Sequence, residues 1–220
     1  MDLFIIGTAW AVYFAAHSLF ASLTIKRWVS DRWPAFVPAY RLAFNGVAGV
    51  LLVVPVWLTA SHHGEAVWVW HGAWAIVARL AAAFAVLGFL WSLRYYDGSV
   101  FLGTRQWRER WSGTADPEAL CVSPLHRFVR HPWYFLCLIL IWTRDLDRAS
   151  LLAAGLITLY LLVGSWLEER KLLVQHGERY ADYRRRVPAL FPSPWRWLRR
   201  DEAAAINAGL RGRTARPVCR

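Results

Sequence analysis

The chain of 220 residues is 57% hydrophobic and 19% charged, and it has a net charge of +11. Soluble domains carry roughly 25% charged residues, so this composition excludes an ordinary water-soluble fold and favours an integral membrane protein. The Lys and Arg residues lie between apolar segments and not on a polar, aromatic-rich surface, which argues against nucleic-acid binding. Three cysteines without a Cys-x-x-Cys spacing indicate neither a disulfide framework nor a zinc site, and we expect no bound metal.

Several stretches of the chain are apolar enough to form membrane helices of about 20 residues. In chain order they are residues 3–23, 42–60, 74–93, the shorter run 133–143, and 150–176. The first stretch lacks a basic leader and a small-residue cleavage site, so we expect a retained helix and not a signal peptide. Only the turn 144–148 separates the last two stretches, which predicts an antiparallel helical hairpin. We therefore expect an all-α polytopic membrane protein with about five transmembrane helices.

Positive charges alternate between the segments that connect these helices. Segments 24–41, 94–130 and 168–220 hold four, six and thirteen Lys or Arg residues, whereas 61–73 holds none and 144–149 holds two. Cytoplasmic connections are enriched in Lys and Arg. The alternation predicts an outside N-terminus and a cytoplasmic C-terminus, and we expect the membrane to be a bacterial inner membrane.

We expect three parts along the chain. Residues 1–115 hold three transmembrane helices and a cytoplasmic loop, residues 116–195 hold the hairpin with a polar C-terminal segment, and residues 196–220 form a basic tail. From Asp201 onward this tail is rich in Ala, Gly and Arg, a composition that predicts disorder and contact with anionic lipid.

Polar residues gather at the predicted cytoplasmic ends of the hairpin. One stretch, 120–134, contains His126 and His131, and the other, 168–188, begins with Glu168-Glu169. A helix over 150–176 would be about 40 Å long, longer than the ~30 Å apolar core of a membrane. Its last turns therefore bring Glu168 level with His131, where a short helix starting at Pro132 would offer its N–H groups to an anion.

Simpler interpretations of these polar residues stay open. His131 before a proline is also typical of an interfacial capping residue. The Glu168-Glu169 pair is also typical of a solvated helix end with local ion pairs. Only the clustering of several such groups at one membrane surface favours a binding or catalytic site.

Two motifs at the ends of the hairpin resemble a known superfamily. They are Arg130-His131-Pro132-Trp133-Tyr134, and then Glu168-Glu169 followed by Gly177-Glu178-x-Tyr180-x-x-Tyr183-x-x-x-Val187-Pro188. In order and spacing, residues 118–192 resemble the isoprenylcysteine carboxyl methyltransferase-like superfamily of membrane methyltransferases. The N-terminal part, with His17-Ser18 and Tyr40-Arg41-Leu42, is more similar to its bacterial methanethiol S-methyltransferase and NnrU-like branch.

The resemblance implies a membrane enzyme that uses S-adenosyl-L-methionine, with residues 116–195 as the methyltransferase core. The catalytic residues it implies are His126 and His131. The cofactor-binding residues it implies are Leu120, Cys121, His126, His131, Pro132, Trp133, Tyr134 and Glu168. We expect Glu169 to contribute less than Glu168 to cofactor binding, because its side chain points about 100° further round the helix.

Two departures from the family pattern bear on the acceptor. Relatives usually have Gly-x-Tyr where this chain has Pro124-Leu125-His126, and an arginine of the prenylcysteine enzymes is replaced by Gly164. Without that cation, the site favours a small thiol or another lipophilic acceptor over a carboxylate. We expect the acceptor to contact Gly164, Phe135 and Trp166.

Two other classes of function remain as alternatives. One is an NADPH-dependent membrane reductase, since such enzymes share the hairpin and a Tyr-rich ending. The other is a non-catalytic membrane protein of the NnrU type. The expected partners are the lipid bilayer and a small thiol or lipophilic substrate, with no nucleic acid, and the sequence favours no particular oligomeric state.

Overall fold

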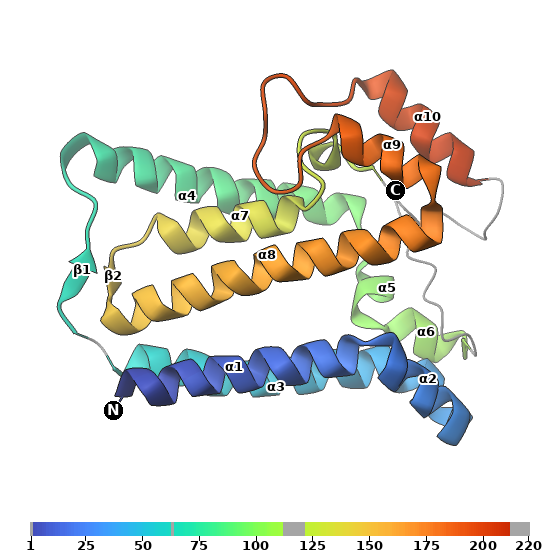
Figure 1. Cartoon of the computed structure of the whole chain (residues 1–220), viewed down its shortest axis with the longest axis horizontal. Helices are drawn as coiled ribbons and strands as arrows, with labels where there is room; N and C mark the ends of the chain where they lie inside the picture. The colour runs from blue at the N-terminus through green and yellow to red at the C-terminus, as the bar shows by residue number, and fades with distance from the viewer. Residues whose placement is uncertain (1, 63, 112–121, 212–220) are drawn as a thin grey trace. The chain divides into compact units, whose positions relative to one another are not determined.

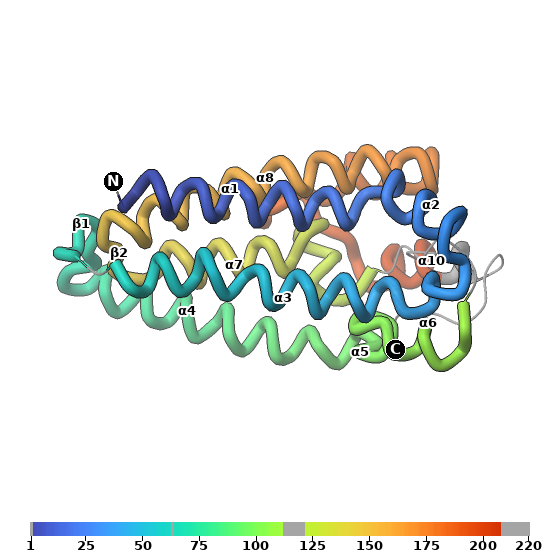
Figure 2. The backbone as a smooth tube through the Cα atoms, turned by 90° about the horizontal axis from the view of Figure 1, so that it is seen from below, coloured from blue at the N-terminus to red at the C-terminus, as the bar shows by residue number. Residues whose placement is uncertain are grey.

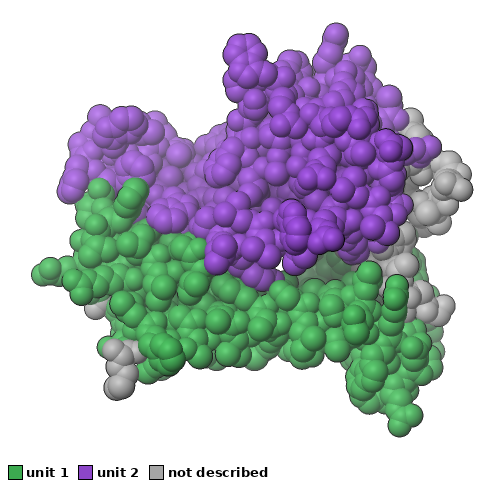
Figure 3. Space-filling model, in the orientation of Figure 1, with its two compact units in different colours: residues 1–69, 98–116, 145–157 green, residues 70–97, 117–144, 158–220 purple. Residues whose placement is uncertain are grey.

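The structure, a computed structural model, describes residues 2–62, 64–111 and 122–211 (Figure 1). The chain divides into two compact units (Figure 3). Unit 1 comprises Met1–Val69, Gly98–Asp116 and Asp145–Ile157, and unit 2 comprises Trp70–Asp97, Pro117–Arg144 and Thr158–Arg220. The units are defined by packing, and the expected division at residues 115 and 195 stays a prediction.

Among the described residues, four helical segments are long and apolar enough to cross a membrane. They are α1 (Asp2–Ala21), the 3₁₀ turn η1 (Pro34–Phe36) with α3 (Val37–Ser61), α4 (Gly72–Ser92) with the 3₁₀ turn η2 (Leu93–Tyr95), and α8 (Arg148–His176). Helix α7 (Pro132–Trp142) is also apolar but has only 11 residues, about 16 Å of helix. The prediction of an all-α polytopic membrane protein is confirmed, and its expected fourth span is this short helix.

Unit 1 is built on the antiparallel pair α1 and α3, which run side by side (Figure 2). Its core joins Ile6 and Trp10 of α1 to Ala149 and Ala153 in the first turns of α8. The connection between α1 and α3 forms α2 (Leu23–Arg32), which begins where the Ser22 hydroxyl accepts a hydrogen bond from the Ile25 N–H at 3.3 Å. Such a bond satisfies an otherwise unpaired N–H of the first helical turn.

Two further contacts tie distant segments of unit 1 together. The short helices α5 (Gly98–Leu102) and α6 (Thr104–Arg108) pack on α3. Strand β1 (Ala66–Trp68) pairs antiparallel with β2 (Leu146–Asp147), and the Asp147 carboxylate accepts the Ser150 N–H at 2.7 Å at the start of α8. The strand pair was not predicted from the sequence.

Unit 2 is organised around α4, α7 and the end of the chain. Helix α4 packs against α7, where Gly88 leaves room for the Leu136 side chain. The 3₁₀ turn η3 (Leu125–Arg127) precedes α7, and helices α9 (Glu178–Arg186) and α10 (Arg200–Arg211) follow α8. Tyr180 and Tyr183 of α9 form a buried apolar cluster together with Val122, Val187, Leu198 and Ala203.

Helix α10 differs from the disordered tail that we expected from Asp201 onward. Ala203 is buried against the tyrosines of α9, and Ile206 packs beside it. Glu202 accepts the Arg199 N–H at 2.7 Å and pairs with Arg186, while the Asn207 side chain bonds the Val122 backbone. These long-range contacts order residues 200–211, because they supply the apolar burial that an Ala-rich segment lacks by itself.

Candidate functional site

The second half of α8 runs antiparallel to α7 within unit 2. Near the end of α7, the Trp142 indole N–H donates to the Thr158 hydroxyl at 3.0 Å. Near its start, the Tyr134 hydroxyl donates to Glu168 Oε2 at 3.3 Å. The hairpin therefore places the C-terminal turns of α8 beside the first turn of α7, where the two sequence motifs meet.

Glu169 lies at the centre of a buried ion-pair network. Its Oε1 accepts from Arg130 Nε at 2.8 Å and Arg130 Nη2 at 2.6 Å, and lies 3.3 Å from His131 Nε2. Its Oε2 lies 3.1 Å from Arg184 Nε of α9. The side chains of Glu169 and Arg130 are each only 7% exposed. A charge removed from water in this way requires several partners, and Glu169 has three.

The same arginine attaches the segment after α9 to the hairpin. Arg130 Nη1 donates to the backbone oxygens of Arg184 and Val187. The backbone N–H groups of Arg130 and His131 donate to Pro188 O and Ala189 O at 2.9 and 3.0 Å. The Arg-His-Pro motif is thus fixed from both sides, by α8 and by the segment that follows α9.

Glu168 has a different environment from its neighbour. Its Oε2 lies 3.5 Å from His131 Nδ1, and its side chain is 39% exposed. It is paired with His131 and Tyr134, yet its side chain stays more exposed than that of Glu169. Of the two glutamates, Glu168 is therefore the one that can accept hydrogen bonds from a ligand.

The two histidines carry opposite pKa shifts. Burial by itself would lower the pKa of His131, but hydrogen bonds to Glu168 and Glu169 on its two ring nitrogens outweigh burial and raise the pKa. Burial lowers the pKa of His126 to about 4, with a smaller contribution from the charge of His131. His126 is therefore neutral near neutral pH, whereas His131 favours the charged form.

His126 is held by a second polar contact and lies in an aromatic cluster. Its Nδ1 lies 2.8 Å from the hydroxyl of buried Ser123, and Tyr183 donates to its carbonyl oxygen at 2.7 Å. The Tyr96 ring lies 6.3 Å from the His126 ring and 4.6 Å from the Trp133 ring, measured between centroids. We call Tyr96, His126 and Trp133 the aromatic cluster.

The remaining predicted residues are only partly gathered at this site. Gly164 lies four residues before Glu168 and so on the same face of α8, and a Cβ added there would meet no atom within 4 Å. Phe135 packs edge-on against Phe191, and Trp166 lies under Arg170 on the opposite face of α8 from Glu168. The structure therefore does not bring Trp166 together with the others. Leu120 and Cys121 lie outside the described residues.

Some site residues were missed by reasoning from the sequence. Tyr96, Ser123 and Arg184 were not singled out, and the buried ion pairs of Glu169 were not predicted. Their contacts join segments that are far apart in the chain, and no spacing rule connects them. The buried pairing of Glu169 with Arg130 also excludes the simple interpretation of Glu168-Glu169 as a solvated helix end.

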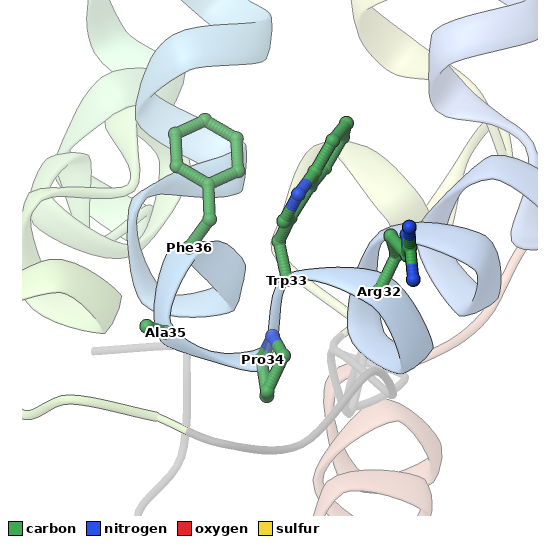
Figure 4. A pocket seen from close by; sticks show the side chains of 5 residues that line it. All are labelled: Arg32, Trp33, Pro34, Ala35 and Phe36. Carbon is green, nitrogen blue, oxygen red and sulfur yellow. The ribbon is translucent and has the colours of Figure 1, made fainter.

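Unit 1 contains a hollow that none of the predicted site residues line. The hollow of about 630 Å³ lies at the junction of α2 and η1, and it is lined by Arg32, Trp33, Pro34, Ala35 and Phe36 (Figure 4). Exposed aromatic and basic side chains next to a spanning helix are typical of interfacial anchors.

Among the described residues, no three His, Cys, Asp or Glu side chains gather where they could hold a metal ion.

Comparison with known proteins identifies several similar sequences. The chain is 33% identical over 198 residues to a methanethiol S-methyltransferase of Pseudomonas sp. (strain GM41(2012)), covering 82% of this chain and 70% of that protein. It is 32% identical over 205 residues to methanethiol S-methyltransferase 2 of Bradyrhizobium diazoefficiens, covering 84% and 71%. It is 32% identical over 195 residues to the methanethiol S-methyltransferase of Mycobacterium tuberculosis, covering 84% and 76%. No family model and no solved structure matches the chain.

Proposed function

Because the chain belongs to the methanethiol S-methyltransferase family, we propose that this membrane methyltransferase transfers a methyl group from S-adenosyl-L-methionine to a small thiol. A methyltransferase requires a methyl donor and an acceptor. We propose S-adenosyl-L-methionine as the donor and a small thiol as the acceptor. The observation that carries this proposal is the pairing of His131 and Tyr134 with Glu168, whose side chain is partly exposed.

The groups around Glu168 suit this methyl donor. S-adenosylmethionine carries a cationic sulfonium, an ammonium group and ribose hydroxyls, all of which a carboxylate can bind. The aromatic cluster lies near enough to Glu168 for its charge to act on Tyr96, and we propose that these rings form the apolar side of the cofactor site. When bound, the cofactor supplies an activated methyl group, and the protein's task is to position the acceptor in line with it.

We assign different roles to the two histidines. A thiol acceptor must lose its proton, and His126 is our candidate to take it at Nε2, because its Nδ1 is paired with Ser123. The pKa of about 4 keeps this imidazole neutral near neutral pH but makes it a weak base, so we assign it the proton that becomes acidic as the thiol sulfur attacks the methyl group. His131 bridges Glu168 and Glu169, so we assign it the positioning of Glu168 and not proton transfer.

The acceptor that we propose is small and uncharged. Prenylcysteine enzymes of the superfamily have an arginine that would pair with the substrate carboxylate, and this chain has Gly164 at that position. A Cβ added at Gly164 would meet no atom within 4 Å. A small thiol needs no cationic partner, whereas a buried carboxylate without one would be strongly disfavoured. Phe135 of α7 is the apolar residue that we propose to contact the acceptor.

Assays on the purified full-length chain test the function. With S-adenosylmethionine and methanethiol, we expect dimethyl sulfide in the headspace, and with N-acetyl-farnesylcysteine we expect little or no carboxyl methylation. Calorimetric titration should show binding of S-adenosylhomocysteine and none of NADPH. Binding of NADPH alone would instead support the reductase alternative, and robust methylation of the prenylcysteine would overturn the proposed acceptor.

A further inference from the structure

Tyr96 occupies a defined position beside the candidate site although it lies outside the motifs. It follows η2 at the end of α4 in an extended conformation, with φ −114° and ψ 140°. That turn directs its ring to Trp133, at a centroid distance of 4.6 Å and an interplanar angle of 46°. Residues 118–192 carry the family resemblance, so Tyr96 has no role assigned by it.

The Trp133 ring is held from the side of α4. Its indole N–H donates to the Ser92 hydroxyl at 2.9 Å, and Ser92 in turn donates to Phe89 O at 2.7 Å. Ser92 is 1% exposed, and the Phe89 ring lies 5.1 Å from Trp133. Tyr96 and Trp133 themselves are half-buried, so neither residue is fully enclosed by the protein.

The negative charge of Glu168 acts on Tyr96 in the aromatic cluster. Glu168 also accepts a hydrogen bond from Tyr134 at 3.3 Å, and the charge of His131 acts on His126. Burial and then the negative charge of Glu168 raise the pKa of Tyr96, so its phenol stays neutral. His126, the third member of the cluster, is also uncharged near neutral pH, because burial lowers its pKa to about 4.

We propose that the ring faces of Tyr96 and Trp133, together with Glu168, hold the sulfonium cation of S-adenosylmethionine, an inference that rests on the proposed function. Aromatic faces attract cations through the negative charge density above the ring, and tryptophan and tyrosine do so best. The product S-adenosylhomocysteine has lost this charge. The cluster therefore favours the methyl donor over the spent product, which assists product release.

This role predicts a specific pattern of binding. An aromatic cluster that only packed α4 against α7 would, when disrupted, weaken the binding of both ligands equally. A cluster that recognises the sulfonium would, when disrupted, weaken only the charged ligand. The measured quantity is therefore the ratio of the dissociation constants for S-adenosylhomocysteine and S-adenosylmethionine.

Calorimetry on the purified full-length chain tests this ratio. We expect Tyr96→Leu to weaken S-adenosylmethionine binding roughly 3- to 30-fold and to leave S-adenosylhomocysteine binding unchanged, while Tyr96→Phe keeps most of the preference. Tyr95→Leu is the matched control, because the Tyr95 ring lies against Trp91, 5.1 Å away, and not in the cluster. An equal loss for both ligands, or no loss for either, overturns the inference.

A second comparison does not depend on the folding of the leucine variant. Phenylalanine and pentafluorophenylalanine at position 96 have nearly the same shape, but fluorination reverses the charge distribution of the ring. We expect the fluorinated protein to lose affinity for S-adenosylmethionine only, and identical affinities contradict the inference. If the wild-type chain binds neither ligand, the proposed function itself fails. If the wild type binds both ligands but the variants lose no selective affinity for S-adenosylmethionine, only this inference fails.

Discussion

Glu168 and Glu169 are neighbours in the sequence with different surroundings. Glu169 is buried and holds Arg130, His131 and Arg184 together, so it links α8 to α9 and to the start of α7. Glu168 contacts His131 and Tyr134 and stays partly exposed. One carboxylate therefore stabilises the fold around the site, and the other is available to a ligand.

Alanine substitutions should separate these two roles. Glu169→Ala leaves the Arg130 guanidinium buried without its anionic partner, which costs about 3–5 kcal/mol. We expect a fall in melting temperature of roughly 10 °C, measured in detergent. Glu168→Ala should leave the melting temperature nearly unchanged and weaken S-adenosylhomocysteine binding roughly 10- to 150-fold, because one charge-assisted hydrogen bond is lost.

Glu178→Ala is the control for both measurements, since Glu178 is an exposed carboxylate in the first turn of α9. It should change neither stability nor binding. If Glu168→Ala bound S-adenosylhomocysteine as tightly as wild type, the assignment of Glu168 to the cofactor would be wrong. A normal melting temperature for Glu169→Ala would contradict its structural role.

The site residues differ in how far the sequence could predict them. His131 and Glu168 were brought together by helix length alone, because a helix of this length must carry its last turns past the apolar core. The partners of Glu169 could not be found in that way. Arg130 lies 39 residues away and Arg184 on another helix, so no periodicity connects them. Tyr96 was missed for the same reason.

At the scale of elements, the turn between α5 and α6 depends on one glycine. Gly103 has φ +90°, and a Cβ there would lie 2.6 Å from the Leu42 backbone nitrogen in α3. The neighbouring carbonyls of Phe101 and Leu102 accept hydrogen bonds from the Asn45 amide, at 3.0 and 3.1 Å. The glycine allows α3 and this turn to approach closely enough for those bonds.

We therefore expect Gly103→Ala to be destabilising. A left-handed conformation costs a residue with a side chain about 1–2 kcal/mol, and the contact with α3 adds to that cost. The melting temperature of the purified protein should fall by several degrees. Gly46→Ala, within α3 and with open space around it, should instead be neutral or slightly stabilising, because alanine favours helix. Equal effects of the two substitutions would refute the argument.

The long apolar helices could be predicted from the sequence, whereas the short paired strands β1 and β2 could not. The spans appear in the sequence as apolar runs of membrane length, whereas β1 and β2 are two or three residues long and pair across about 80 residues of chain. Helix α10 was missed because its composition resembles a linker. Its order comes from Ala203 and Asn207, whose partners on α9 and at Val122 are visible only in the folded chain.

At the scale of the whole molecule, the prediction of a membrane protein follows mainly from composition and from the pattern of charges. Large apolar side chains such as Val50, Trp57 and Leu80 are exposed on helices of membrane length, as expected where lipid replaces water. Along the chain, connections rich in Lys and Arg alternate with connections that have few or none. These two patterns need no long-range contact, which is why the sequence predicts a membrane protein before any site is known.

The orientation that we propose from the charge pattern can be tested directly. With Cys121, Cys137 and Cys219 replaced by serine, single cysteines are introduced at Glu65 or Arg185, both exposed positions. A membrane-impermeant maleimide added to intact cells should label position 65, in the connection between α3 and α4 that has no Lys or Arg. It should label position 185 only after the membrane is opened, because the Arg-rich α9 favours the cytoplasmic side. Labelling of position 185 in intact cells would place the Glu168 end of α8 outside the cell and would reverse the proposed topology.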